Sequence, residues 1–211
     1  MNNTSRTSPS LRTVRTKSDA LRVFLRQPSP QILAAAFATA ISLRARERRF
    51  GGRDIALVGT VIAAQGTHEW LIHRFLLHAP RRSLRGLVID PGAGHREHHS
   101  DPDVLDNALL KAPDAASFVA LIGAYIALVV SPGRRVFAGR HVLSAVATAY
   151  ATLLVYEWTH YLDHTSVPLR STRAQRLRAH HRRHHFVDER RWLGITSTSG
   201  DSFFRTAAQQ E

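Results

Sequence analysis

The sequence predicts an all-α protein with about four long helices, because apolar runs of helical length alternate with polar segments that carry histidines. The 211 residues include 13 histidines and no cysteine, and their formal net charge is +13. This length is typical of one domain rather than two. Without cysteine the chain can form no disulfide framework, thiolate nucleophile or iron–sulfur cluster, so any metal must bind nitrogen and oxygen ligands.

We expect residues 1–28 to form a polar, disordered tail and residues 29–211 to form a single domain. The tail is rich in serine, threonine and arginine, a composition that buries too little apolar surface to fold. It contains no uninterrupted apolar segment next to a small-residue cleavage site, so we do not expect a signal peptide.

Four stretches rich in alanine, valine, leucine and isoleucine define the predicted helices: residues 30–43, 54–67, 115–131 and 142–158. Each is shorter than the roughly 20 residues needed to cross a hydrocarbon core, although the second and fourth can run on into the histidines that follow them. The mean hydropathy of −0.19 averages polar ends with apolar middles. Hydropathy therefore leaves two structures open, a soluble helical bundle and a set of membrane helices below a polar cap.

The distribution of basic residues favours the membrane structure slightly. If four helices cross a bilayer, 21 lysines and arginines lie on the side of the histidines and 8 lie on the other side. This bias agrees with a cytoplasmic active site under the positive-inside rule. The basic run at residues 44–53 conflicts with that topology, unless the first and shortest segment enters the bilayer as a shallow hairpin.

Ten histidines fall into two pairs and two triplets. The pairs are HRFLLH and HYLDH, and the triplets are HREHH and HRRHH. Residues three and four apart share a face of a helix, so each triplet is predicted to present three imidazoles to one side. The five-residue spacing of the first pair is looser and calls for a helix end or a kink. The predicted metal ligands are His73, His78, His95, His98, His99, His160, His164, His181, His184 and His185.

The histidine pattern occurs twice along the chain. Each half consists of an apolar helix, a histidine pair, a linker and a triplet, and the linker has the same length in both halves, from His78 to His95 and from His164 to His181. Such a repeat is not expected from composition alone. Two half-sites of five imidazoles each predict a dimetal centre, and neutral imidazole suits iron, zinc or copper.

Three histidines fall outside the pattern: His68, His141 and His180. They are predicted to be ordinary side chains, because a single histidine is more often satisfied by the fold or by solvent than bound to a metal. His68 could still support a ligand.

Carboxylates near the histidines are predicted to orient the ligands, because ligating histidines usually donate their second N–H to a carboxylate or a carbonyl oxygen. The candidates are Glu69, Glu157, Asp163 and Asp201. Glu69 and Glu157 lie near the ends of apolar helices, where an unpaired carboxylate is costly. For Asp201, helix capping in the GDSFF turn is an equally good explanation.

The positive charge has three ordinary explanations: nucleic acid, an anionic membrane surface or solvated charge. The arginines are scattered over both ends of the chain without a recognition motif, so we expect no binding to nucleic acid. Three arginines lie among the predicted ligands: Arg74, Arg182 and Arg183. They are candidates for binding a carboxylate or phosphate of the substrate, with lipid headgroups or solvent as the alternative.

These motifs resemble the fatty acid hydroxylase/sterol desaturase superfamily of membrane dimetal enzymes, and its fatty acid 2-hydroxylase branch in particular. The matching segments are HRFLLH with Glu69 before it, HREHH, YEWTHYLDH, and HHRRHHF followed by LGIT and GDSFFRT. They cover roughly residues 60–206. The resemblance implies about four transmembrane helices below a cytosolic helical cap, and a dimetal centre carried by the ten histidines. Many eukaryotic members also carry a fused cytochrome b5-like domain, and we expect no such domain within these 211 residues.

The resemblance also implies O₂ as co-substrate and hydroxylation of a membrane lipid or acyl chain. Because this reaction needs a redox-active metal, we expect two iron ions. Electrons would come from a separate ferredoxin- or cytochrome b5-like protein. Zinc would fit the same ligands in isolated protein but has no redox chemistry. We expect an integral protein of a bacterial cell membrane with its active site facing the cytoplasm. Two other functions stay open: a desaturase, or a carotenoid or sterol hydroxylase, of the same superfamily, and a soluble zinc hydrolase.

Overall fold

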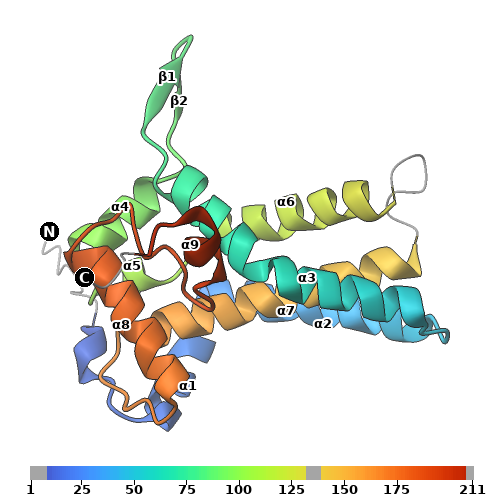
Figure 1. Ribbon diagram of the computed structural model, residues 1–211, viewed down its shortest axis with the longest axis horizontal. Coiled ribbons are helices and arrows are strands. Elements are labelled where there is room, and N and C mark those ends of the chain that lie inside the picture. Colours follow the sequence, from blue (N-terminus) through green and yellow to red (C-terminus); the bar gives the residue numbers. More distant parts are fainter. Residues whose placement is uncertain (1–8, 132–138, 208–211) are drawn as a thin grey trace, which may run out of the picture.

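The computed structural model describes residues 9–131 and 139–207, and most of these residues are helical (Figure 1). The helical elements are η1 (Leu11–Thr13), α1 (Lys17–Leu25), α2 (Pro28–Arg46), α3 (Gly52–Ile72), η2 (His73–Leu77), α4 (Ala93–Ser100), α5 (Leu105–Ala108), α6 (Ala112–Val130), α7 (Arg140–Asp163), α8 (Thr172–Phe186) and α9 (Ser199–Phe204). One antiparallel hairpin, β1 (Arg82–Leu84) and β2 (Leu87–Ile89), is an addition to the predicted all-α fold. The prediction of a mainly helical fold is confirmed, but the all-α prediction did not include this hairpin.

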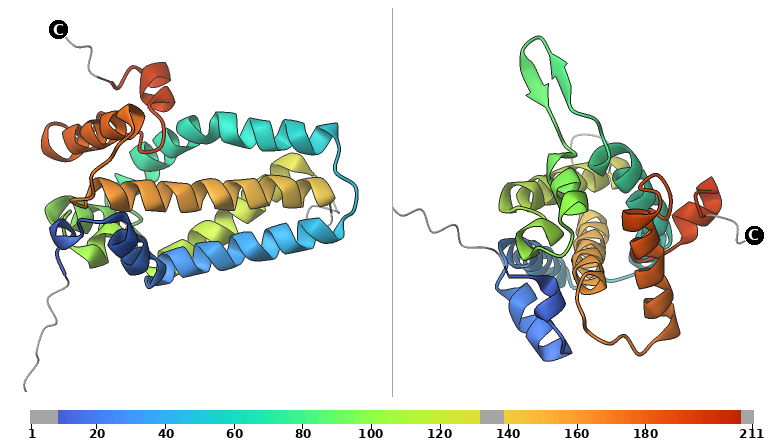
Figure 2. Two further views of the ribbon diagram at one scale, coloured as in Figure 1. Left: turned by 90° about the horizontal axis from the view of Figure 1, so that it is seen from below. Right: turned by 90° about the vertical axis from the view of Figure 1, so that its left-hand side faces the viewer.

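The four long helices α2, α3, α6 and α7 coincide with the four predicted apolar stretches, of which only residue 131 falls outside its helix, and they lie side by side along the long axis (Figures 1 and 2). α7 is central and contacts the other three. Its buried face carries small residues such as Ala145 and Ala149, which allow neighbouring helices to approach closely. Proline in the first turn of α2 and of α6 marks where these helices begin. The shorter helices gather toward one end and form a cap there (Figure 2).

Two helices in the described part of the chain are long and apolar enough to cross a membrane, Gly52–Leu77 and Leu105–Val130. Each segment has 26 residues, and only 17% of its most apolar window is buried within the protein. Large apolar side chains such as Ile62 and Leu128 therefore point outward. A soluble bundle would bury such faces, so the structure favours a membrane protein. Crossing by four helices stays a prediction.

The N-terminal segment is folded where the structure describes it, so the prediction of a disordered tail is wrong for η1 and α1. Leu11 is 1% exposed, and the Phe24 ring packs edge-on against Trp158 with their centroids 5.0 Å apart. The Thr16 side chain caps α1 by accepting a hydrogen bond from the Asp19 backbone N–H. The few apolar side chains of η1 and α1 are spaced so that they pack against the cap. Their burial stabilises the segment despite its polar composition. Residues 1–8 of the predicted tail lie outside the described residues.

A buried polar cluster holds α2, α3 and α7 together at the end of the bundle far from the cap. Asp54 is fully buried, and one of its carboxylate oxygens lies 3.3 Å from the guanidinium of Arg44. The same oxygen accepts a hydrogen bond from the Ser144 hydroxyl at 2.7 Å and lies 3.0 Å from Nδ1 of His141. Arg44, the first charge of the basic run, is thus neutralised inside the bundle, which reduces the conflict with the positive-inside rule.

Replacing Asp54 by alanine is expected to destabilise the fold by about 3–5 kcal/mol, because it leaves the Arg44 charge buried without its partner. Unfolding by denaturant in detergent micelles measures this change. Arg46→Ala removes an exposed arginine two residues further along the chain and is expected to cost less than about 0.5 kcal/mol. Equal stability of the two variants would contradict a stabilising role for the cluster.

Candidate metal centre

All ten predicted ligands converge in the cap, where four separate segments meet. The α3–η2 junction and the end of α7 each supply a histidine pair, while α4 and α8 each supply a triplet. The set is largely withdrawn from solvent: His181 and His184 are fully buried and His73 is 1% exposed. The structure thus brings together residues as far apart in sequence as His73 and His185.

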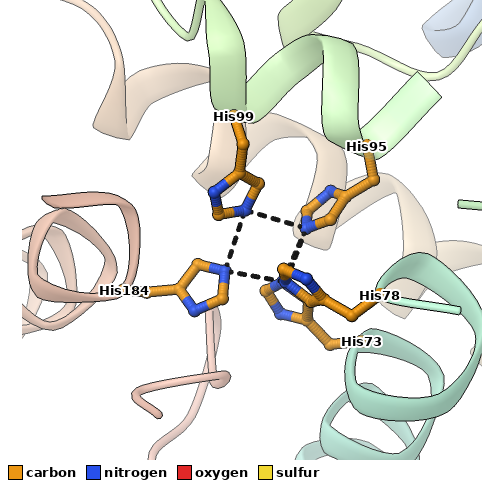
Figure 3. A group of neighbouring side chains, drawn as sticks. All are labelled: His73, His78, His95, His99 and His184. Carbon is orange, nitrogen blue, oxygen red and sulfur yellow. Dashed lines mark hydrogen bonds between the residues drawn. The ribbon is translucent and has the colours of Figure 1, made fainter. Parts of the chain in front are cut away.

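The histidines form two groups of five, and within each group the nitrogen atoms that could bind a metal all lie within 4.8 Å of one another. The first group, in which the five rings point toward one another, is His73, His78, His95, His99 and His184 (Figure 3). The second group is His98, His160, His164, His181 and His185.

The two groups do not follow the two halves of the sequence, which corrects the predicted half-sites. His98 joins the group of the second half, and His184 joins the group of the first half. The physical reason is the helical period: residues four apart lie about 40° beyond one full turn, whereas residues three apart lie about 60° short of it. α4 and α8 lie between the groups, so each sends its outer two imidazoles one way and its middle imidazole the other.

A π-helical turn explains the five-residue spacing of the first pair. In η2 the His78 backbone N–H donates to the carbonyl of His73, five residues earlier, at 3.1 Å. This pattern brings residues five apart onto one face, and His73 and His78 stack with ring centroids 5.2 Å apart. The second pair, His160 and His164, has the four-residue spacing of the regular helix α7. The five-residue spacing of His73 and His78 already indicated this turn in the sequence, because it has one residue more than the four-residue spacing of a regular α-helix.

The nitrogen atoms that face each other have the spacing of ligands around one ion. Neighbouring Nε2 atoms are 3.0–3.2 Å apart in the first group and 2.9–3.1 Å apart in the second. Nitrogen ligands 2.0–2.1 Å from a common ion and at right angles to one another stand about 3 Å apart.

The tautomers point to the same conclusion. Nδ1 of His73 donates to the Leu193 carbonyl at 2.6 Å, and Nδ1 of His184 donates to the Arg191 carbonyl at 2.8 Å. In the second group His160 donates from Nδ1 to the Ala108 carbonyl, and its buried Nε2 has no hydrogen-bond partner among the described residues. Each of these rings directs a lone pair into its group. A metal cation satisfies such lone pairs, so the donor set fits metal ions.

The imidazoles of the cap helices are electrically neutral, as metal ligands must be. Burial lowers the pKa of His95, His98 and His181 well below the usual value of 6.5, and the neighbouring histidines lower it further. The same causes lower the pKa of His99 to about 4. Five protonated imidazoles could not share so small a space without strong repulsion.

The four predicted carboxylates bind groups other than the ten histidines. Glu69 accepts from the backbone N–H groups of Ile195 and Thr196, and Glu157 accepts from the Ser29 hydroxyl and the Leu110 N–H. Asp163 lies 3.8 Å from the Arg178 guanidinium, and Asp201 accepts from His180 and from the backbone N–H groups of Leu193 and Gly194.

Among the described residues these carboxylates form no hydrogen bond with the ten histidines, so the predicted direct orientation of the ligands is not seen. Backbone carbonyl groups orient three of the histidines instead: His73, His160 and His184. Glu69 and Asp201 both bind the loop that follows α8, and this loop supplies the Leu193 carbonyl to His73. Glu69 and Asp201 therefore position the ligand His73 indirectly, by holding the loop whose carbonyl group binds it. Nothing in the sequence marks a carbonyl as an acceptor, because every residue carries one.

The remaining candidates occupy separate places. Arg182 lines a small cavity of about 100 Å³ beside His164 and His185 in the second group. Arg74 is half-buried next to the first group, and Arg183 is exposed on α8. Binding of a substrate headgroup by these arginines stays a prediction.

The three histidines outside the pattern also lie outside both groups. His141 belongs to the Asp54 cluster at the far end, and His180 binds Asp201. His68 lies 3.0 Å from the Ala64 carbonyl, on the wall of an apolar cavity.

Two adjoining cavities extend from the long helices to the histidines. The larger, of about 390 Å³, lies between α3, α6 and α7 and is lined mainly by apolar side chains. The smaller, of about 200 Å³, reaches His95 of the first group and both His98 and His160 of the second. Six residues line both: Leu76, Leu77, Leu110, Phe118, Leu121 and Tyr156. This route, which the sequence did not predict, joins the apolar part of the bundle to the candidate metal centre.

Residues 58–206 match a protein-family model described as fatty acid hydroxylase. A fatty acid 2-hydroxylase of Mus musculus is 28% identical over 148 residues, which are 68% of this chain and 37% of the mouse protein. A fatty acid 2-hydroxylase of Macaca fascicularis is 31% identical over 143 residues, 65% of this chain and 36% of that protein. A dihydroceramide fatty acyl 2-hydroxylase of Arabidopsis thaliana is 30% identical over 145 residues, 65% of this chain and 54% of that protein.

The chain thus spans little more than a third of the length of these mammalian relatives and about half of the plant relative. No solved structure matches it.

Proposed function

The chain belongs to the fatty acid hydroxylase family, and from this premise we propose that it inserts one oxygen atom of O₂ into a C–H bond of a lipid acyl chain. The relatives at 28–31% identity are named as fatty acid or dihydroceramide fatty acyl 2-hydroxylases. The observation that carries the proposal is the apolar route between α3, α6 and α7 that ends on both histidine groups.

The ten histidines are proposed to hold two iron ions, five imidazoles to each. Bound iron would supply the redox chemistry that zinc lacks, activating O₂ for attack on an acyl C–H bond. Overall, one C–H bond becomes C–OH, the second oxygen atom of O₂ leaves as water, and two electrons and two protons are consumed. The electrons are proposed to come from a separate ferredoxin- or cytochrome b5-like protein.

The protein residues would bind the acyl chain and keep water away from the reacting carbon. Phe118 and Leu121 of α6 and Leu76 of η2 form apolar walls where the two cavities meet. Tyr156 faces the same junction, and its ring lies parallel to that of His160 with centroids 5.9 Å apart. A chain lying along these walls would present its carbons to His98 and His160 at the inner end.

We propose that α2, α3, α6 and α7 cross the membrane together and that the cap with the histidines faces the cytoplasm. α7 has 24 residues and is therefore about 36 Å long, enough to span a hydrocarbon core of about 30 Å. Lateral entrance of a lipid from the bilayer into the cavity between α3 and α6 agrees with this arrangement. A bacterial cell membrane as the location stays a prediction.

Mass spectrometry of total lipids tests the proposed reaction. Cells expressing the protein, with a working electron donor and ¹⁸O₂ gas, are expected to contain a lipid species that carries one additional ¹⁸O atom. Cells expressing His98→Ala are expected to lack it, because one ligand of the second group is missing. Iron and protein content, measured in the same cells, serve as controls.

Other products would change the assignment. A lipid lighter by two hydrogen atoms would indicate desaturation at the same centre, and a hydroxylated sterol or carotenoid would change the substrate class. Oxygen derived from water rather than from O₂ would contradict the oxygenase and favour a hydrolase. The soluble zinc hydrolase is disfavoured by five imidazoles in each group and by the outward-facing apolar helices.

A further inference from the structure

The β1–β2 hairpin projects away from the rest of the molecule across the direction of the long helices (Figures 1 and 2). Every residue of its two strands is exposed. Leu84 and Leu87 are 64% and 65% exposed, and Val88 and Ile89 are also largely exposed. Two three-residue strands with no apolar partner make a marginally stable element in water. Something outside the described chain must cover these side chains if they are to leave water.

One face of the hairpin is mainly aliphatic. Arg85 and Gly86 both have positive φ, 50° and 83°, as a two-residue type I′ turn requires. Leu84 is paired with Leu87 and Arg82 with Ile89, so these four residues share one face. The opposite face carries Ser83 and Val88. One face therefore presents three large aliphatic side chains and one arginine.

The base of the hairpin is held at the end of a membrane-type helix. Arg82 lies five residues after Leu77, the end of the apolar segment, a separation of at most about 18 Å. After β2, Gly92 packs so tightly that an added Cβ would lie 2.6 Å from the Leu77 carbonyl oxygen. Arg96 donates to the Ala79 carbonyl at 3.0 Å and forms an ion pair with Asp90. The hairpin thus leaves the protein near the level at which the apolar helices end.

The charges around the turn are positive and unpaired. Arg81, Arg82 and Arg85 are all exposed, and no carboxylate of the described residues pairs with any of them. A short element that combines exposed aliphatic side chains with arginines suits the boundary of an anionic membrane. There the aliphatic groups reach the acyl region while the guanidinium groups bind lipid phosphates.

We propose that the β1–β2 hairpin lies in the headgroup layer of the membrane, with Leu84, Leu87 and Ile89 in the acyl boundary and the arginines on anionic phosphates. The residues at its base favour this location: Leu76 and Leu77 before it and Pro91 after it line the cavities that lead to the histidines. The hairpin holds the bilayer against this side of the cap, next to the cavity. The inference requires the helices to cross a membrane but does not depend on the reaction catalysed.

A single cysteine tests the location, because the natural chain has none. Leu87→Cys in the full-length protein is spin-labelled and reconstituted into vesicles of phosphatidylcholine and phosphatidylglycerol. Accessibility of the label to dissolved oxygen and to an aqueous nickel chelate reports its depth. Leu128→Cys, on the exposed face of α6, is the membrane reference, and Arg176→Cys, exposed on α8, is the aqueous reference.

The label at residue 87 is expected to lose chelate accessibility to the level of the Leu128 label. This protection should be weaker in vesicles of phosphatidylcholine alone, because the arginines then lack anionic phosphates. Chelate accessibility equal to that of the Arg176 label would overturn the proposal. So would dipolar coupling between labels on two chains at aqueous depth, which would indicate strand pairing with a second copy. None of these readouts needs turnover, so they are independent of the proposed hydroxylation.

Discussion

Two double variants that differ by one position are expected to lose metal in different ways. His98→Ala/His185→Ala removes two ligands from the second group, and His99→Ala/His185→Ala removes one ligand from each group. The first variant is expected to keep one iron ion per chain at unchanged affinity and to lose the other. The second is expected to hold both ions at least about tenfold more weakly. Both should form less than about 1% of the wild-type hydroxylated lipid. Mutating only a residue that hydrogen-bonds a metal ligand can already reduce activity by up to about 100-fold.

Iron content measured during titration with a chelator distinguishes the two variants. The pair is matched, because both share His185→Ala and the other change moves by one residue along α4. If each ion were held by one half of the sequence, both variants would lose one ligand per ion and would release iron alike. Identical chelator curves would therefore contradict the two groups seen in the structure. His68→Ala, which changes a histidine outside both groups, is expected to keep two ions at wild-type affinity.

Lengthening the π-helical turn by one residue is expected to weaken iron binding strongly, whereas shortening it by one residue is expected to leave iron binding unchanged. One alanine inserted between Phe75 and Leu76 places six residue steps between His73 and His78. On a helix six steps leave His78 about 120° away from His73, so the first group loses a ligand. The ion of that group is expected to bind at least about tenfold more weakly, and hydroxylated product is expected to disappear.

Deletion of Phe75 is the matched control. It leaves four residue steps between the two histidines, the spacing that His160 and His164 already have on α7. A regular α-helical turn then keeps both imidazoles on one side, and Phe75 itself is 66% exposed. Iron content should therefore stay at two ions per chain. Loss of iron on deletion and retention on insertion would show that the π turn does not set the ligand geometry.

The four apolar stretches and the ten histidines could be predicted because each depends on a local pattern. Hydrophobic runs of helical length become α2, α3, α6 and α7, and the HxxHH spacing identifies the candidate ligands, although each triplet is divided between the two groups. The N-terminal segment could not be predicted by composition. Its burial depends on Trp158 and Tyr161, which belong to α7 and lie in the distant second half of the chain.

The carboxylates show a different limit. A glutamate before each histidine pair is visible in the sequence, but its burial and its hydrogen-bond partner are not. Glu69 holds the loop after α8, and Glu157 holds Ser29 and Leu110, because those backbone and hydroxyl donors are brought next to them by the fold. A residue type predicts the need for a partner, whereas the identity of the partner comes from packing.

The sequence by itself determined the four long helices, the number and identity of the candidate ligands and the extra residue between His73 and His78. These features follow from the period of a helix and the chemistry of imidazole, both of which act over a few residues. Only the tertiary structure decided that His98 and His184 exchange groups and that an apolar cavity reaches both groups. The physical reason is that a helix presents imidazoles in several directions. The positions of α4 and α8 between the two groups determine which imidazoles point into each group.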